Sequence, residues 1–138
     1  MVSTKVDLNH DKVRRASDLD ELAALLFPSN KNHQKTFLAI FVELKWAQDQ
    51  FLPVLEPIAA KQNISRRTLE TVRAKMRRLG LIDHVSRFNK KHGYREGWVF
   101  SERFCHSLHI LAETISQHRR GNGRFQEMKD RDIFKYVD

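Results

Sequence analysis

The chain has 138 residues, a length that suits one domain built around a single hydrophobic core. Hydrophobic residues make up 41% and charged residues 30%, an ordinary globular composition, and no stretch approaches the roughly 20 apolar residues that a membrane-spanning helix needs. The first residues lack the apolar run of a signal peptide, and Cys105, the single cysteine, cannot form an internal disulfide. We therefore expect a cytoplasmic protein without membrane contact.

The net charge of +8 is concentrated in one part of the chain. Residues 61–95 hold eleven basic side chains against two acidic ones, Glu70 and Asp83, so this segment carries all of the excess positive charge. A localised basic surface attracts polyanions, because each phosphate that it neutralises releases condensed counterions. The charge distribution therefore predicts a nucleic acid as the partner.

The first 16 residues show no hydrophobic periodicity and predict a flexible arm. Ser17 or Asp18 is placed to cap a helix that stops at Pro28. A second helix is expected over residues 31–48. Its broad apolar face consists of Phe37, Ile40, Phe41, Leu44 and Trp46.

A short helix is expected to begin near Pro57, since proline fits the first turn of a helix but not its interior. The following "NIS" predicts a turn, and the Ser65 hydroxyl is placed to cap the next helix. Gly80 should end that helix. Its apolar positions fall on one stripe at helical spacing: Leu69, Val72, Met76 and Leu79.

After Gly80 the pattern becomes typical of strands. The stretches "LIDHVSRF" and "EGWVFSERF" are rich in β-branched and aromatic residues and flank a polar loop with a glycine, which predicts a two-stranded hairpin. A final helix is expected from Ser101 or Glu102 to Gln117, and the remaining tail is polar. The apolar residues of that helix are Phe104, Leu108, Leu111, Ala112 and Ile115.

This order of elements resembles the winged helix-turn-helix family. The likeness is carried by "IAAKQNISRRTLETVRAKMRRLGLI", with paired alanines in a short helix, a turn of the form xIS, and a second helix that ends in LxxLGLI. Met76 stands where leucine is commoner in the family, a change of shape that a core tolerates. The match covers about residues 55–104. The two helices before it and the helix after it are similar to the layout of dimeric regulators of the multiple-antibiotic-resistance repressor type.

The resemblance implies a mostly helical fold with a small β-hairpin, a winged helix-turn-helix with additional N- and C-terminal helices. We divide the chain into a flexible arm (1–16), a DNA-binding domain with flanking helices (17–118) and a polar tail (119–138). Such proteins generally read two half-sites as dimers. A homodimer is therefore expected, through the apolar surface of the helices predicted at 17–27, 31–48 and 104–117.

Helix geometry and the resemblance together place DNA contacts on the recognition helix, residues 65–79, in the major groove. With the apolar stripe turned inward, Ala74 lies at the centre of the outward face and lets the helix approach base edges, while arginines beside it reach guanines or phosphates. Glu70 either accepts from a cytosine or pairs with Arg66 or Arg73. The expected contact residues are Ser65, Arg66, Arg67, Thr68, Glu70, Thr71, Arg73, Ala74, Arg77 and Arg78.

The hairpin, residues 82–103, is expected to act as the wing on the adjacent backbone or minor groove, where a narrow groove favours inserted cations. The expected contacts near its tip are Arg87, Lys90, Lys91, His92 and Arg95. Tyr94 is expected to lie against sugar or backbone. An alternative for the lysines is protection of the hairpin edge from pairing with other strands.

We therefore expect a sequence-selective double-stranded DNA-binding protein that acts as a transcriptional regulator. The alternatives are a replication-initiation, plasmid-maintenance or architectural DNA-binding protein, and a winged-helix protein-interaction module. Without a glycine-rich phosphate loop, an HExxH motif or a nucleophile beside a base, no enzyme and no cofactor are expected. Nor do we expect a metal site, because no complete ligand shell accompanies the residues weighed for one: His84, His92, Cys105, His106 and His109.

Overall fold

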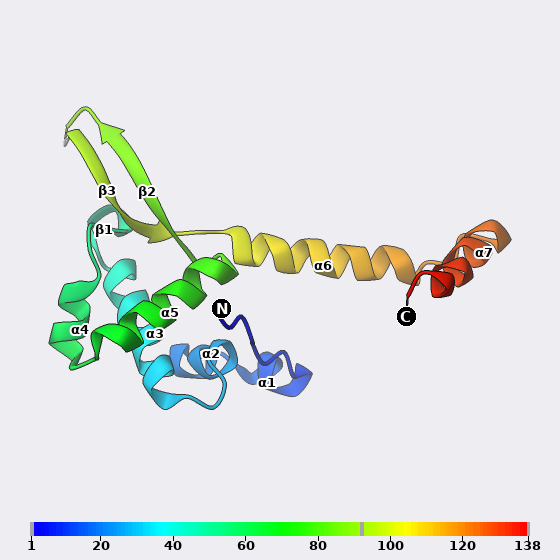
Figure 1. The fold of residues 1–138 in the computed structure, drawn as a ribbon, viewed down its shortest axis with the longest axis horizontal. Coiled ribbons are helices and arrows are strands. Elements are labelled where there is room, and N and C mark those ends of the chain that lie inside the picture. The colour runs from blue at the N-terminus through cyan, green and yellow to red at the C-terminus, as the bar shows by residue number, and fades with distance from the viewer. Residues whose placement is uncertain (1, 92, 138) are drawn as a thin grey trace. The chain divides into compact units, whose positions relative to one another are not determined.

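The computed structural model describes residues 2–91 and 93–137 (Figure 1). The fold is mostly helical, as predicted, with a small antiparallel sheet of three strands in the order β1-β3-β2. The chain divides into two units, Met1–Phe104 and Cys105–Asp138. The first unit contains the hydrophobic core and the basic segment, so the candidate site lies there.

The first unit contains five helices and the three strands among its described residues. Its elements are α1 (His10–Arg15), α2 (Leu19–Leu26), α3 (Lys31–Lys45), the 3-10 turn η1 (Gln48–Gln50), β1 (Phe51–Leu52), α4 (Glu56–Gln62), α5 (Arg66–Leu79), β2 (Ile82–Asn89) and β3 (Gly93–Phe100). Helix α6 (Arg103–Arg119) starts at its end and continues into the second unit, which also contains α7 (Arg124–Asp132) and the 3-10 turn η2 (Ile133–Lys135).

Two of the predicted helices, α2 and α3, are confirmed, and side chains accept from backbone N–H groups at the start of both. The Glu21 carboxylate accepts from the backbone N–H of Asp18 at 3.4 Å, and the Asn30 side chain accepts from the N–H of His33 at 3.0 Å. Helix α3 ends at Lys45, before residue 48. Trp46 therefore does not share the buried face of α3 as predicted, and 74% of it is exposed.

The segment predicted as a flexible arm contains a helix and is attached to the first unit. Asn9 caps α1 by accepting from the N–H of Lys12 at 3.2 Å. The N–H of Asp7 donates to the Leu25 carbonyl at 2.8 Å, and Val6 packs against the hydrophobic core. The prediction of a flexible arm was wrong because the contacts of Val6 and Asp7 with the rest of the unit are long-range and leave no periodic pattern in the sequence.

The segment predicted as a polar tail also contains a helix, α7. Large apolar side chains are exposed within α7 (Phe125) and beyond it (Phe134 and Tyr136). Of the described helices, none is long and apolar enough to cross a membrane.

Helices α4 and α5 follow the prediction closely. Pro57 lies in the first turn of α4, and Asn63 adopts the left-handed conformation (φ 55°) in the turn that follows. The Ser65 hydroxyl accepts from the N–H of Thr68 at 3.1 Å and so caps α5. Gly80 ends α5 with φ 93°, and a Cβ at this position would lie 2.8 Å from the Cβ of Arg103. Both the backbone conformation and the close approach of the chain require glycine there.

The hydrophobic core lies between α3, α5 and the base of the sheet, with α2 and α4 beside them. Aromatic rings run through it in sequence, with 5.6 Å between the centroids of Phe27 and Phe37, 5.6 Å between Phe37 and Phe41, and 5.1 Å between Phe41 and Phe100. The aliphatic residues of the core include Leu26, Ile40, Leu44, Leu55, Ile58, Leu69, Val72, Met76 and Ile82. This core holds α5 at a defined orientation on the surface of the unit.

The hairpin is confirmed as β2 and β3, and a short strand not predicted from the sequence, β1, pairs with β3. Phe51 lies opposite Val99, and Leu52 lies opposite Trp98. Gly97 allows this pairing, since a Cβ there would lie 2.6 Å from both the Leu52 carbonyl oxygen and the Phe51 ring.

Candidate nucleic-acid interface

Helix α5 turns its apolar stripe into the core and its arginines outward. Leu69, Val72 and Met76 are buried, as predicted, and Leu79 is half-buried at the helix end. On the opposite side the exposed residues are Arg66, Arg67, Glu70, Thr71, Arg77 and Arg78. The sequence therefore predicted the two sides of this helix correctly.

The acidic groups near this face are paired, while several arginines of α5 form no ion pair among the described residues. Arg66 lies 3.4 Å from the Glu70 carboxylate, one of the two roles expected for Glu70. Among the described residues, no carboxylate forms an ion pair with Arg67 or Arg78. Their guanidinium groups are exposed to solvent, and each can bind a phosphate oxygen or the acceptor edge of a guanine.

The hydroxyl groups at the start of α5 are engaged within the protein. The Ser65 hydroxyl donates to the Thr68 hydroxyl at 2.8 Å in addition to capping the helix. The Thr71 hydroxyl donates to the Arg67 carbonyl at 2.9 Å. These three residues, expected as DNA contacts, thus have hydroxyl groups that are engaged in hydrogen bonds within the protein.

Arg73 and Arg77 lie along the side of α5 that faces the sheet. The Arg73 guanidinium carbon is 5.2 Å from the centroid of the Trp98 ring, and that of Arg77 is 6.0 Å from it. Stacking on an aromatic face fixes a guanidinium and leaves its edge available to an acceptor. Arg77 is exposed and Arg73 is half-buried, so Arg77 is the better placed of the two to bind a ligand.

Lys75 belongs to the basic segment but is buried. Its ammonium group donates to the backbone carbonyls of Lys5 and Leu26 and lies 4.4 Å from the centroid of the Phe27 ring. Burial lowers the pKa of Lys75 below its ordinary value. From the sequence, Lys75 was included in the basic surface of residues 61–95, because no neighbouring residue indicates that its side chain is buried.

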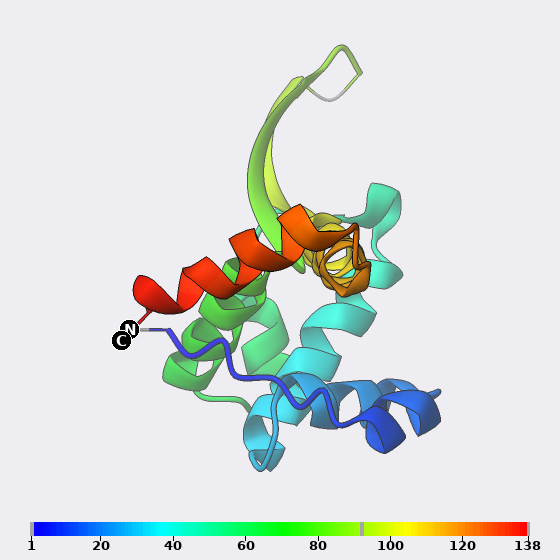
Figure 2. The same ribbon diagram turned by 90° about the vertical axis from the view of Figure 1, so that its right-hand side faces the viewer.

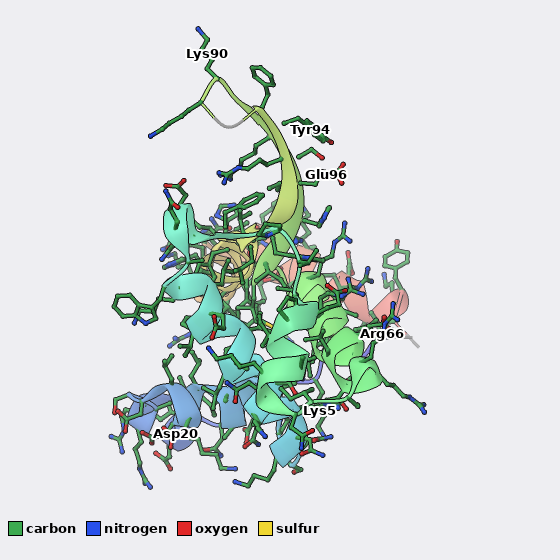
Figure 3. All side chains as sticks on the ribbon, turned by 90° about the vertical axis from the view of Figure 1, so that its left-hand side faces the viewer. Lys5, Asp20, Arg66, Lys90, Tyr94 and Glu96 are labelled. Atoms are coloured by element: carbon green, nitrogen blue, oxygen red, sulfur yellow. The ribbon has the colours of Figure 1, made fainter. Side chains whose placement is uncertain are left out.

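The hairpin places its side chains on two different faces. In the register of β2 with β3, Arg87 lies opposite Arg95, and Phe88 lies opposite Tyr94. Adjacent positions on a strand point to opposite sides, so the arginine pair and the aromatic pair are on opposite faces. Figure 3 shows Lys90 at the far end of the hairpin, with Tyr94 and Glu96 along one side of β3.

Arg95 was predicted at the hairpin tip, but it is half-buried against η1 and β1. Its guanidinium carbon lies 4.5 Å from the centroid of the Phe51 ring, and a guanidinium nitrogen lies 3.7 Å from the Asp49 carboxylate. Arg87, Lys90 and Lys91 are exposed. His92, also expected at this site, lies outside the described residues.

Phe88 was missed by the sequence analysis, and it forms an exposed aromatic pair with Tyr94. The exposed fractions are 78% for Phe88 and 63% for Tyr94, and the Tyr94 hydroxyl donates to the Glu96 carboxylate at 2.6 Å. Phe88 lies on the same face of β2 as Ser86 and the buried Ile82, so the available signal was the strand periodicity that places a large apolar residue beyond the core.

The base of the hairpin is joined to the end of α5 by Arg103. Its guanidinium donates two hydrogen bonds to the Asp83 carboxylate and one, at 3.1 Å, to the Arg77 carbonyl. The hydrogen bond from Arg103 is the main reason that the pKa of Asp83 is below its ordinary value. Arg103 therefore fixes the angle between α5 and the hairpin, and the two can present their cations together.

Two hollows border the outward face of α5, and the first residues of the chain line both. A hollow of about 630 Å³ is lined by Val2, Ser3 and Lys5 together with Arg67, Glu70, Thr71 and Ala74. A second hollow, of about 550 Å³, is lined by Val2 together with Ala74, Arg77, Arg78 and Asp83. Figure 2 shows the same N-terminal segment, in dark blue, passing beside the helices of the first unit. Ala74, expected at the centre of an open face, is half-buried.

A group of side chains close enough to share a cation is found at the start of α2. It consists of Asp18, Asp20 and Glu21, and the histidines weighed earlier do not belong to it in the part of the chain that the structure describes. Acidic residues in the first turn of a helix are explained by the helix dipole.

Comparisons with protein-family models, with curated proteins and with solved structures found no match to this chain.

Proposed function

We propose that this protein binds double-stranded DNA sequence-selectively as a winged helix-turn-helix protein and acts as a transcriptional regulator. The observation that carries the proposal is the outward face of α5, where Arg67 and Arg78 are exposed without an acidic partner among the described residues while the opposite side of the helix is held by the core. A helix with its side chains is about 10–12 Å wide and matches the major groove, which is about 12 Å wide. In this proposal Arg67, Arg77 and Arg78 contact base edges or phosphates.

The β2–β3 hairpin serves as the wing in this proposal. Each strand has eight residues, so the hairpin is about 26 Å long at roughly 3.3 Å per residue. The exposed cations Arg87, Lys90 and Lys91 lie in its outer half. Placed beside α5, they contact the adjacent backbone or the minor groove, where phosphates provide affinity rather than sequence information.

We also propose a homodimer, but with only one of the three predicted helices, α6, as the contact between the two copies. The apolar residues of α2 and α3 are largely used in the internal core, for instance Leu26, Phe37 and Leu44. Helix α6, described over its full length, has no buried residue. Leu111 and Ile115, one turn apart on it, are 52% and 53% exposed, which favours α6 as the contact between two copies.

The experiment that tests the proposal is selection of bound sequences from a pool of random duplexes. We expect enrichment of one sequence with inverted half-sites, because a two-fold symmetric dimer reads a palindrome. Absence of binding to any duplex at low ionic strength would contradict the proposal, since electrostatic attraction to phosphates is strongest there. Binding with weak sequence preference would instead indicate the replication, plasmid-maintenance or architectural role.

A further inference from the structure

The N-terminal strap, which we define as residues 2–6, is held against α5 by a buried lysine. The Lys75 ammonium donates to the carbonyl of Lys5, 70 residues earlier in the chain, and also to the carbonyl of Leu26 at the end of α2. Val6 at the end of the strap packs against the core. The end of the strap at residues 5 and 6 is thus held in two ways. Lys75 of α5 donates a hydrogen bond to Lys5, and Val6 packs against the core.

The other end of the strap lies at the outward face of α5. Val2 lines both hollows that border this face, and Ala74 lines both as well. Helix geometry turns Ala74 away from the core, on the side opposite Met76, yet Ala74 is half-buried. Val2 and Ala74 border the same two hollows, which places the strap at this face of α5. Figure 1 shows the N-terminal segment beside α5.

A helix that carries an extra segment of chain on its outward face does not fit the major groove. The helix and its side chains already occupy about 10–12 Å of a groove about 12 Å wide. An extended chain beside Ala74 adds several ångströms of backbone and side chain. The strap and a duplex therefore compete for the same face.

We propose that the strap is an intramolecular cover of the recognition face of α5, and that DNA binding requires its displacement. This inference rests on the proposed function and adds a regulatory step to it. The fraction of molecules with the strap displaced sets the apparent affinity, because only those molecules can place α5 in the groove. A substitution that stabilises the strap against α5 therefore weakens DNA binding, and a substitution that destabilises this contact strengthens DNA binding.

Lys75 links the two states. With the strap in place its ammonium donates to the carbonyls of Lys5 and Leu26 and lies 4.4 Å from the centroid of the Phe27 ring, so its charge has partners in the buried setting. Displacement of the strap removes this acceptor and opens one side of the ammonium. A phosphate oxygen of the bound duplex can then replace the carbonyl, at the edge of the same groove.

The first experiment measures coverage without DNA. Ala74→Cys is made in a Cys105→Ser background, and its rate of reaction with a small thiol reagent is compared with and without residues 2–5. We expect deletion to raise the rate at least fivefold. The matched control is the native Cys105, an exposed cysteine in the second unit, whose rate in the Ala74 chain should not change on deletion. An unchanged rate at residue 74 would overturn the proposed cover.

A second variant tests the cover with all residues of the strap present, so that a loss of stability caused by the deletion does not explain the result. Lys75→Met keeps the length of the side chain and the full strap but removes the donor to Lys5 and Leu26. We expect it too to raise the reaction rate at residue 74, with the far-ultraviolet circular dichroism of the native protein retained. A rate equal to that of the lysine protein would show that Lys75 does not hold the strap.

The second experiment measures the competition with DNA. Val2→Cys and Ala74→Cys, again with Cys105→Ser, are joined by a reductant-cleavable bifunctional thiol reagent. We expect the joined form to bind the selected duplex at least tenfold more weakly than the same protein after reduction, and the deletion of residues 2–5 to bind at least fivefold more tightly than the full chain. Equal affinities, or weaker binding by the deletion, would overturn the competition. If no form binds any duplex, the proposed function fails, while the reaction rates at residue 74 still decide whether the strap covers α5.

Discussion

Arg103 donates two hydrogen bonds to the carboxylate of Asp83, 20 residues earlier, and so joins the start of α6 to the start of β2. The same guanidinium reaches the Arg77 carbonyl near the end of α5. Three elements are thereby fixed to one another around Gly80, whose carbonyl accepts from the N–H of Phe104 at 3.0 Å. This junction sets the geometry between the outward face of α5 and the hairpin.

Asp83→Asn should lower the stability of the protein in a pH-dependent manner. The hydrogen bond from Arg103 lowers the pKa of Asp83 below 3.8, so the ionised carboxylate stabilises the folded state above that pH. As the pH falls below about 3.8 and through the lowered pKa of the folded state, this contribution is lost. We expect the free energies of unfolding of the two proteins, measured with urea, to differ at pH 7 and to converge in acid.

Asp49→Asn is the matched control, because its carboxylate lies 3.7 Å from Arg95 and is 60% exposed. An exposed ion pair contributes little to stability. A difference between wild type and Asp83→Asn that stayed constant from pH 7 to pH 2 would rule out the proposed role of the carboxylate charge.

Gly97→Ala should destabilise the sheet. The new methyl group would lie 2.6 Å from the Leu52 carbonyl oxygen and 2.6 Å from the Phe51 ring, so β1 has to move away from β3. Overpacking of this kind costs about 1–3 kcal/mol. Urea denaturation of both proteins measures the difference. Gly121→Ala is the control, since nothing lies within 4 Å of a Cβ there, and equal losses for the two variants would contradict the steric account.

Arg67→Ala and Arg78→Ala should weaken binding to the selected duplex more than binding to random duplexes. An arginine that reads a guanine contributes about 1–3 kcal/mol and defines one position of the site, and we expect the same pattern for Arg77. Binding titrations against the selected site and single-position variants measure both effects. Equal losses on selected and random DNA for all three arginines would exclude base reading by α5.

Lys90→Ala should weaken binding to all sequences alike. A lysine on the phosphate backbone contributes counterion release, so its loss should reduce the slope of log K against log salt by about one. Titrations at several salt concentrations measure the slope. Arg119→Ala, which removes the same charge from the second unit, serves as the control, and an equal change of slope in both variants would assign the effect to net charge rather than to contact.

Leu111→Glu should disrupt the proposed dimer. Leu111 and Ile115 are more than half exposed on a helix without buried residues, and a buried charge in a contact between two copies is strongly unfavourable. Sedimentation velocity at micromolar concentration should change from dimer to monomer. Glu113→Gln on the same helix is the control. A wild-type protein that sediments as a monomer both alone and with DNA would refute the dimer.

Much of the fold could be predicted because its signals are local. The cap at Ser65, the stop at Gly80 and the apolar stripe of α5 depend on residues within a few positions of one another, and these elements formed where expected. The hairpin followed from its composition and glycine loop. Prediction failed where a local pattern was absent, as in α1, or where a helix ended early and left Trp46 outside the core.

The sequence by itself determined the start and end of α5, its inward apolar stripe and the concentration of positive charge between residues 61 and 95, because caps, periodicity and charge act over a few residues. Only the tertiary structure decided which cations are available. It buried Lys75 beneath the Lys5 carbonyl, packed Arg95 on Phe51, and placed Val2 at the outward face of α5. Each of these depends on contacts between residues far apart in the chain, for which the nearby sequence contains no signal.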